Sequence, residues 1–266
     1  MSSCLLLVDP PQSGVWNMAV DEALLAAADE RGEAAIRIYR WSEPTLSLGY
    51  FQRAEDRAAH APSRDCPIVR RHSGGGALVH DRELTYAIAL PATHPQARRP
   101  PDLYRIAHAA LIEALAEQCA AVQTFACGEL GCANDGSCSA DGQQHGDDDQ
   151  FLCFARRHPI DLVAANSSDT PAPKLVGSAQ WRRRGALLQH GSLLLARSAT
   201  APELPGIREA CGVDVDEERL IAACLKQWTA ALQLDGRSGE LSTAVRTAAS
   251  GSANVRYGSA SWTLRR

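Results

Sequence analysis

The stretch VRRHSGGGALVHDRELTYAI, residues 69–88, places two arginines before three consecutive glycines and ends in an apolar, strand-like run. The glycines do not fit a GxxxxGK[ST] phosphate loop, because no lysine follows them, and their spacing does not fit the GxGxxG dinucleotide fingerprint. A tight turn between two strands remains open, since glycine adopts positive φ without a steric penalty. The neighbouring Arg70, Arg71, Ser73 and His80 favour a second use, in which bare backbone is pressed against a ligand.

Composition narrows the class of protein. The chain has 266 residues, of which 45% are hydrophobic, so it can bury a substantial core. It contains no run of roughly 18 uninterrupted apolar residues that would span a membrane, and its start does not resemble a signal peptide. We therefore expect a cytoplasmic protein with no membrane partner. A net charge of −4 gives no reason to expect nucleic acid, and nine cysteines, an odd number, argue against a disulfide framework.

Hydrophobic periodicity predicts helices and strands in a mixed order. Helices are expected over 17–32, with Asn17 as the N-cap, over 102–119 and over 214–234. Alternating or short apolar runs bounded by turn residues predict strands at 34–41, 45–51, 66–71, 84–91, 159–165, 174–183 and 186–196. This order favours an α+β fold with a mainly antiparallel sheet flanked by helices.

Two segments show no clear hydrophobic periodicity. Residues 126–150 are rich in Gly, Ser and Asp, which predicts a mobile loop. Its cysteines and histidine are too irregularly spaced for a zinc site, because no C-x-x-C pair is present, so we expect no metal. We assign 1–235 to one catalytic domain and 236–266 to a C-terminal tail, in which 254–264 is a possible edge strand.

Four motifs in order resemble the biotin/lipoate protein ligase superfamily. They are NMAVDEALL (17–25), YRWSEPTLSLGYFQ (39–52), the arginine-glycine stretch and KLVGSAQWRRRGALLQHGSLLL (174–195). Within the superfamily the chain is most similar to octanoyltransferases and lipoate-protein ligases, over about residues 14–197. The resemblance implies a ligase-like catalytic domain in which the glycine loop and the lysine strand line a tunnel for an eight-carbon acyl chain.

Lys174 and Cys153 are the candidate catalytic residues. Taken alone, a lysine at a strand start is most often a solvated edge charge, and a cysteine between Leu152 and Phe154 is most often a small buried hydrophobe. The resemblance changes both interpretations, because one branch of octanoyltransferases has a similar cysteine that accepts the acyl group as a thioester. Lys174 would then hold the acyl carbonyl and keep Cys153 ionised.

The resemblance also implies an acyl pocket. Its loop would comprise Arg70, Arg71, Ser73, Gly74, Gly75, Gly76 and His80, and its facing wall Gly177, Ser178 and Ala179. His190 is a candidate proton-transfer group, and a satisfied core histidine is an equally good interpretation. The arginines at 156, 157 and 182–184 are expected to steer acidic partners to the tunnel mouth.

The function implied is transfer of an octanoyl group from acyl carrier protein to the lysine of a lipoyl-accepting domain, through a thioester on Cys153. Such acceptors are the glycine cleavage H protein and subunits of 2-oxoacid dehydrogenases. Because the donor is already activated, no cofactor is expected. Three alternatives remain: an ATP- and Mg-dependent lipoate-protein ligase, a homologue that binds lipoyl domains without catalysis, and a transferase that uses the same cysteine to move the acyl group between two lipoyl proteins.

Overall fold

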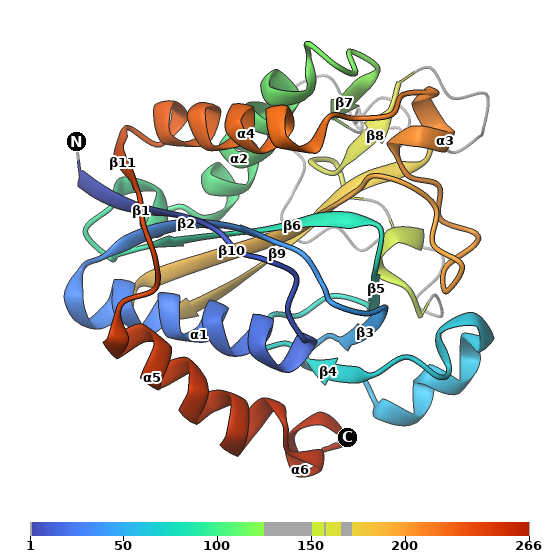
Figure 1. Cartoon of the computed structure of the whole chain (residues 1–266), viewed down its shortest axis with the longest axis horizontal. Coiled ribbons are helices and arrows are strands. Elements are labelled where there is room, and N and C mark those ends of the chain that lie inside the picture. Colours follow the sequence, from blue (N-terminus) through green and yellow to red (C-terminus); the bar gives the residue numbers. More distant parts are fainter. Residues whose placement is uncertain (1, 125–150, 157, 166–171, 266) are drawn as a thin grey trace.

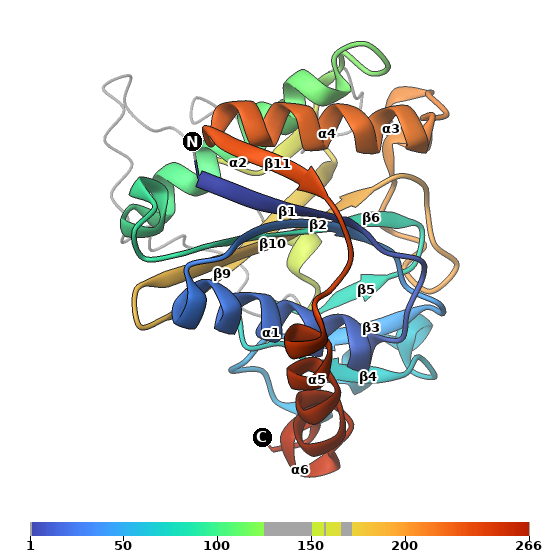
Figure 2. The same cartoon turned by 60° about the vertical axis from the view of Figure 1, so that its left-hand side comes forward.

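The computed structural model describes residues 2–124, 151–156, 158–165 and 172–265. The loop predicted to be mobile, 126–150, lies outside them, together with its three cysteines and His145. Within the described residues the fold is organised around a large mixed sheet with helices on both faces (Figures 1 and 2). This confirms the expected α+β class.

In the part of the chain that the structure describes, eight strands form the large sheet. In spatial order they are β11 (Leu234–Ser238), β1 (Ser2–Val8), β2 (Ala34–Tyr39), β6 (Glu83–Leu90), β10 (Ala186–Leu194), β9 (Lys174–Arg183), β8 (Leu162–Ala164) and β7 (Val122–Thr124). β1 pairs in parallel with β2 and β11, and every other pairing is antiparallel. The sheet is therefore mainly antiparallel, as expected.

Helices cover the two faces of this sheet. α2 (Pro100–Leu115) and α4 (Glu217–Ala231) lie on one face, and α1 (Gly14–Arg31) and α5 (Thr243–Ser252) lie on the other (Figure 1). Successive side chains of a strand point to opposite faces. Ile36 and Ile38 of β2 accordingly pack with α2 and α4, while Ala35 and Tyr39 pack with α1. The alternation of side chains along β2 therefore contributes to the hydrophobic core on both faces of the sheet.

The beginning of α1 differs from the expectation. Its N-cap is Ser13, whose Oγ accepts a hydrogen bond from the amide of Trp16 at 3.3 Å. Asn17 lies inside the first turn, where it is fully buried and its Oδ1 accepts a hydrogen bond from Arg37. The prediction of Asn17 as N-cap was wrong because both residues are good caps, and only the tertiary contact with Arg37 separates them.

A second, three-stranded sheet holds the arginine-glycine stretch. β3 (Thr45–Leu48) lies between β4 (Ile68–Arg70) and β5 (Leu78–His80). The glycines therefore sit in the connection over 71–77 from β4 to β5, two strands that flank β3 and do not pair with each other, so this is a loop rather than the tight turn left open by the sequence. This small sheet lies at one end of the molecule, beyond α1 (right-hand side of Figure 1).

The C-terminal tail is helical, which corrects the edge strand expected at 254–264. α5 continues into a π-helical turn, Ala253–Tyr257, and then into α6 (Ala260–Thr263). Val245, Ala249 and Tyr257 are buried against α1 at helical spacing. One edge strand of the large sheet is instead β11, of which only Leu234 was expected to lie in the preceding helix, while 236–238 were assigned to the tail.

Among the helices that the structure describes, none is long and apolar enough to cross a membrane.

Candidate active site

A pocket opens where the glycine loop faces strands β9 and β10. It encloses about 450 Å³, including its opening to solvent. Nine of the residues expected from the sequence line it: Arg71, Gly74, Gly75, His80, Cys153, Gly177, Ser178, Ala179 and His190. Sequence reasoning missed six further lining residues: Met18, Tyr39, Leu78, Thr85, Gly191 and Ser192. The loop and the strand wall predicted separately are thus brought together around one cavity.

Cys153 is held against the glycine loop by its backbone. It begins the 3₁₀ turn η5 (Cys153–Ala155), and its amide donates to the Ala77 carbonyl at 2.8 Å. The Ala77 amide in turn donates to the Phe151 carbonyl at 2.9 Å. A β-carbon on Gly76 would lie 2.9 Å from the Cys153 nitrogen, closer than real β-carbons approach. Glycine is therefore required at position 76 for the cysteine segment to come this near.

Arg71 provides a buried positive charge beside the cysteine. A β-carbon on Gly75, whose φ is +89°, would lie 3.8 Å from both Arg71 Nη2 and Cys153 Sγ, so the two groups flank this residue. The guanidinium donates to the carbonyls of Ser47 (2.7 Å) and Gly76 (2.8 Å). Burial lowers the pKa of Arg71 to about 10, and the nearby Cys153 charge opposes this shift.

Lys174 reaches the cysteine segment from β9. Its ammonium forms a buried ion pair with Asp161 at 2.8 Å. It also lies 3.5 Å from the Cys153 carbonyl and 3.3 Å from the Arg156 carbonyl. Among the described residues its contacts are therefore with the backbone that carries the thiol, rather than with the sulfur. The expected role of Lys174 at the acyl carbonyl remains a prediction.

His190 and Ser73 form a relay that ends at Asp21 of α1. His190 Nδ1 lies 3.2 Å from Asp21 Oδ2, and its Nε2 lies 2.6 Å from Ser73 Oγ. A carboxylate only accepts hydrogen bonds, so Nδ1 carries a hydrogen, and in the neutral form of the ring Nε2 accepts from the serine hydroxyl. Arg37 and Tyr39 also donate to Asp21, at 2.9 Å each. This fixes the carboxylate that orients His190.

His80 is held in a comparable way. Its Nδ1 lies 2.7 Å from Glu83 Oε1 and its Nε2 lies 2.6 Å from Ser47 Oγ. The ring stacks on Trp41 at 3.9 Å between centroids. Burial lowers the pKa of His80, so the ring is neutral at neutral pH. Both of its nitrogens are occupied, which makes it a rigid part of the pocket wall.

Ser178 joins the wall to a buried chain of polar side chains. Gln189 donates to the Tyr86 hydroxyl at 3.0 Å, and that hydroxyl lies 2.6 Å from Ser178 Oγ. Ser178 Oγ lies 2.7 Å from His108 Nε2, while His108 Nδ1 lies 2.5 Å from the Ile160 carbonyl. Because a carbonyl only accepts, Nδ1 donates, and in the neutral ring Nε2 accepts from Ser178. Burial lowers the pKa of His108 to about 4.

Four expected site residues lie outside the lining, among them Lys174, whose contacts are given above. Gly76 supports the Cys153 backbone, and Ser73 touches the pocket only through His190. Arg70 is fully buried and bonds to main-chain carbonyls of residues 49–52 and of Thr263. The structure thus gives Arg70 contacts with the scaffold in place of the pocket position expected for it.

The basic clusters are divided between two ends of the molecule. Lys174 and Arg183 are the ends of the ten-residue strand β9, which at roughly 3.3 Å per residue is about 30 Å long. Arg183 pairs with Asp29 and Glu30 of α1. Residues 182–184 therefore lie at the hairpin end of β9, away from Lys174, and their role in steering partners remains a prediction. Arg156 lies close to Cys153, and Arg157 lies outside the described residues.

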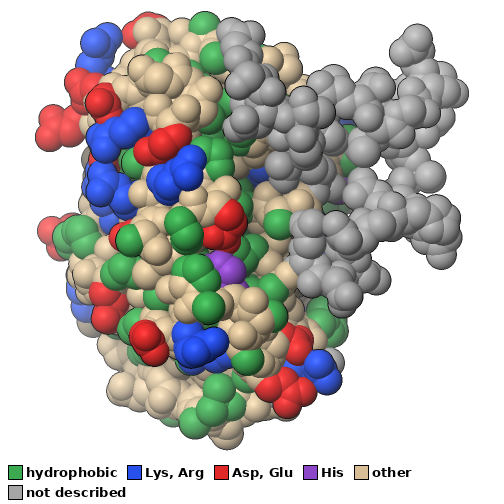
Figure 3. Space-filling view, turned by 90° about the vertical axis from the view of Figure 1, so that its right-hand side faces the viewer, with side chains coloured by type: hydrophobic (Ala, Val, Ile, Leu, Met, Phe, Trp, Pro, Cys, Tyr) green, Lys and Arg blue, Asp and Glu red, His purple; other side chains and the backbone are tan. Residues whose placement is uncertain are grey.

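The face at the end where β5 and η5 lie is not of one charge. Basic and acidic side chains are interspersed there with hydrophobic ones (Figure 3). A partner that docks on this face would therefore contact separate positive and negative side chains rather than a surface of one charge.

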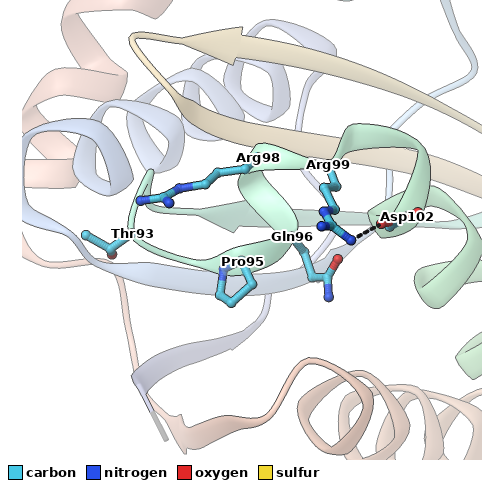
Figure 4. Close-up of a pocket in the computed structure, with 6 residues that line it drawn as sticks. All are labelled: Thr93, Pro95, Gln96, Arg98, Arg99 and Asp102. Carbon is cyan, nitrogen blue, oxygen red and sulfur yellow. Dashed lines mark ion pairs between the residues drawn. The ribbon is translucent and has the colours of Figure 1, made fainter.

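A second depression lies around residues 93–102, at the start of α2 (Figure 4), and Cys153 is not part of its lining. Its lining is Thr93, Pro95, Gln96, Arg98, Arg99 and Asp102. Arg99 pairs with Asp102 at 3.8 Å, and the lining includes no thiol or histidine. In the described part of the chain, no cluster of three or more His, Cys, Asp or Glu side chains could hold a metal ion.

Comparisons with known proteins agree with this geometry. The model of the lipoyl protein ligase A/B catalytic domain matches residues 13–201. The octanoyltransferase LipM of Kyrpidia tusciae is 31% identical over 277 aligned positions, covering 94% of this chain and 94% of that protein. The octanoyltransferase LipM of Oceanobacillus iheyensis is 35% identical over 71% of this chain and 63% of that protein.

A solved structure shares the fold. The bipartite lipoate protein ligase of Thermoplasma acidophilum, studied with its E2 lipoyl domain, superimposes with a TM-score of 0.73 over 99% of this chain and 97% of that one, at 17% identity. At that identity the likeness concerns the fold alone, while the family model and the relatives carry the classification. The chain therefore belongs to the lipoyl protein ligase A/B family, and it is an acyltransferase enzyme of protein lipoylation.

Proposed function

We propose that this octanoyltransferase carries the acyl group on Cys153 as a thioester, taking it from octanoyl-acyl carrier protein and delivering it to a lysine of a lipoyl-accepting domain. The observation that carries the proposal is the position of Cys153. Its partly exposed thiol lines the pocket, beside the buried guanidinium of Arg71. A cation next to a thiol is the usual setting of a reactive cysteine.

The first half-reaction exchanges one thioester for another. Sγ of Cys153 attacks the donor carbonyl, a new C–S bond forms, the donor C–S bond breaks, and the carrier leaves as a thiol that takes up the proton lost by Cys153. Thioester exchange is close to isoenergetic, so a thiolate is a suitable acceptor. Because the donor is already activated, we propose that neither ATP nor Mg is required.

The second half-reaction forms the amide. The neutral amine of the acceptor lysine attacks the Cys153 thioester, the C–N bond forms as the C–S bond to Cys153 breaks, and the proton lost by the amine passes through a base to the leaving sulfur, which regenerates the thiol. His190 lines the same pocket, and Asp21 fixes its tautomer so that Nε2 can accept a proton. We assign the acceptance of that proton to His190, with Ser73 as its hydrogen-bond partner.

Lys174 acts in this scheme on the position of the cysteine. Its contacts with the carbonyls of Cys153 and Arg156 tie the 3₁₀ turn to β9, and Asp161 neutralises its charge. Met18, Tyr39 and Leu78 supply apolar surface to the pocket, which suits an aliphatic acyl chain. Acceptors such as the glycine cleavage H protein or 2-oxoacid dehydrogenase subunits, and a cytoplasmic location, are part of the same proposal.

Intact-protein mass spectrometry tests the proposal directly. Wild type, Cys153→Ala and Cys211→Ala are incubated with octanoyl-acyl carrier protein, without ATP and without acceptor. Cys211 is a matched control, because its thiol is also partly exposed but lies in α3 (Ile207–Cys211), outside the pocket lining. We expect one octanoyl adduct on wild type and Cys211→Ala, and none on Cys153→Ala.

Adding a lipoyl domain to the isolated acyl-enzyme should then move the adduct to the acceptor. Modification of the acceptor that needs ATP and free octanoate or lipoate, and that survives Cys153→Ala, would identify a ligase instead. Acceptor binding with no acylation under either condition would identify a non-catalytic homologue.

A further inference from the structure

Helix α6 at the C-terminus contacts the first arginine of the glycine stretch. Arg70 is fully buried, and its Nε and Nη2 donate to the main-chain carbonyl of Thr263 at 3.1 and 2.9 Å. In return, the indole Nε1 of Trp262 donates to the Arg70 carbonyl at 3.0 Å. Both the side chain and the backbone of Arg70 are therefore bound to α6.

The other arm of the same guanidinium holds the turn at 49–52. Nη1 of Arg70 donates to the carbonyls of Gly49 at 2.9 Å and Gln52 at 2.6 Å. Arg265 adds a second link, because its guanidinium lies 3.8 Å from the centre of the Tyr50 ring and donates to the Tyr50 carbonyl at 3.1 Å. The turn at 49–52 is therefore bound by Arg70, which contacts α6, and by Arg265 at the C-terminus.

The turn in its own right supports the glycine loop. The amide of Tyr50 donates to the Ser73 carbonyl at 2.9 Å. A β-carbon on Gly49 would lie only 2.0 Å from the Gly75 carbonyl oxygen, so the two backbones are in close contact. A shift of the turn would therefore displace the loop beside which Cys153 lies.

A second branch runs from the turn to the cysteine segment. The side-chain amide of Gln52 donates to the Phe151 carbonyl at 3.2 Å, and its Oε1 accepts from the Gly49 amide at 2.9 Å. The Phe151 carbonyl also accepts the Ala77 amide, which belongs to the pairing that holds Cys153. Contacts are therefore continuous from α6 through Arg70 and the turn to the residues around the thiol.

We infer that α6 is a positioning element for the acyl transfer, and that Trp262 and the Thr263 carbonyl set the location of the glycine loop and Cys153 through Arg70. The inference rests on the function proposed above. The family model ends at residue 201, so α6 lies outside the part of the chain that it matches. A small misplacement of reacting groups slows a reaction strongly, which gives this remote helix an effect on the rate.

Three variants test the role of α6. Deletion of 259–266 removes the helix. Trp262→Phe keeps an aromatic ring against His72, whose ring is tilted to that of Trp262 at 4.5 Å between centroids, but loses the donor to Arg70. Val245→Ala is the matched control, because Val245 is buried between α5 and α1, where its loss destabilises the same C-terminal region without touching the turn.

Two readouts are needed. The first is single-turnover acylation of Cys153 at saturating donor, recorded both as a rate constant and as the final fraction acylated. We expect the rate constant to fall at least about tenfold in the deletion and about threefold in Trp262→Phe, with the final fraction preserved. Val245→Ala should keep the wild-type rate constant. A purely structural role would instead lower the final fraction and leave the rate constant alone, and that result overturns the inference.

The second readout does not depend on the reaction. Hydrogen exchange at the amides of Tyr50, Ala77 and Cys153, which bond within this network, should accelerate in the deletion and in Trp262→Phe but not in Val245→Ala. Unchanged exchange at these amides in both α6 variants also overturns the inference. If wild type itself is not acylated, the proposed function fails while the exchange experiment still decides the role of α6.

Discussion

The ammonium of Lys174 lies 2.8 Å from the carboxylate of Asp161, and both side chains are almost completely buried. Lys174 begins β9 and Asp161 directly precedes β8, and their pairing places a neutralised cation next to the backbone of Cys153. Asp161 Oδ2 also accepts the amide of His158 at 2.8 Å, and Tyr104 donates to Oδ1 at 3.2 Å. The segment that follows the cysteine is therefore ordered by one carboxylate.

Asp161→Asn should destabilise the protein strongly. It leaves the Lys174 charge buried without its partner, and breaking a buried pair in this way lowers the free energy of unfolding by about 3 kcal/mol. Denaturant unfolding measures the loss, and acylation of Cys153 should slow because its segment loosens. Glu33→Gln is the control, since the Arg31–Glu33 pair is exposed and contributes at most about 0.5 kcal/mol. If Asp161→Asn lowered the free energy of unfolding as little as this control does, the Lys174–Asp161 pair would not be shielded from water.

Gly76→Ala should impair acylation more than stability. The new β-carbon would meet the nitrogen and Cα of Cys153 at 2.9 and 3.0 Å, so the cysteine segment must move away from the loop. We expect the acylation rate to fall more than about tenfold, because the thiol moves relative to the pocket. Gly251→Ala in α5 is the control, since its β-carbon meets nothing within 4 Å. Wild-type acylation by Gly76→Ala would mean that the close contact is not needed.

The arrangement around the pocket was predictable only in part. The glycine stretch, the wall at 177–179 and Cys153 follow from motifs that lie along the chain, and the structure places them around one cavity. Asp21 was missed, although it lies within the motif NMAVDEALL, because nothing in a sequence shows that a helix carboxylate points at a histidine 169 positions away. Such a contact depends on the packing of α1 against β10.

The C-terminal region shows a second limit. Its apolar residues are sparse, and the run at 254–264 contains enough β-formers to suggest a strand. The helical pattern of Val245 and Ala249 becomes decisive only when α1 is present to cover it. The role of Arg70 was missed for a related reason, since its acceptors are carbonyls of a turn and of α6 rather than a ligand.

Protonation of His108 should make stability depend on pH. Its pKa is about 4 in the folded protein, below the ordinary value of 6.5, so the unfolded chain binds the proton first as the pH falls. The free energy of unfolding should therefore decrease from about pH 6.5 and level off near pH 4, with a loss of roughly 3 kcal/mol from this residue. His108→Gln removes that contribution, although it lowers stability at pH 7.

Denaturant unfolding of wild type and His108→Gln at several pH values between 7 and 4 measures the difference. His72 and His80 also have lowered pKa values and remain in both proteins, so only the difference between the two slopes belongs to His108. Parallel pH profiles would show that the ring is protonated in the folded state, with the Ser178 hydrogen bond reversed.

Charge-reversal variants should show that the arginine near Cys153 affects acylation and that the arginines on the β9–β10 hairpin do not. Arg184 is largely exposed on the β9–β10 hairpin, far from Cys153 along β9, and lies 4.0 Å from Asp29. Arg184→Glu should therefore leave the acylation rate and its salt dependence within about twofold of wild type, because charges beyond a Debye length of roughly 10 Å are screened.

Arg156 follows Cys153 by three residues, at the end of η5. Arg156→Glu should slow acylation by an acidic carrier several-fold at low salt, and the difference should shrink as salt is added. Single-turnover acylation at low and high ionic strength compares the two variants, with Arg246→Glu on α5 as an additional distant control. An equal effect of Arg184→Glu and Arg156→Glu would mean that the carrier reaches across the sheet to the hairpin, and the docking surface would then include α1.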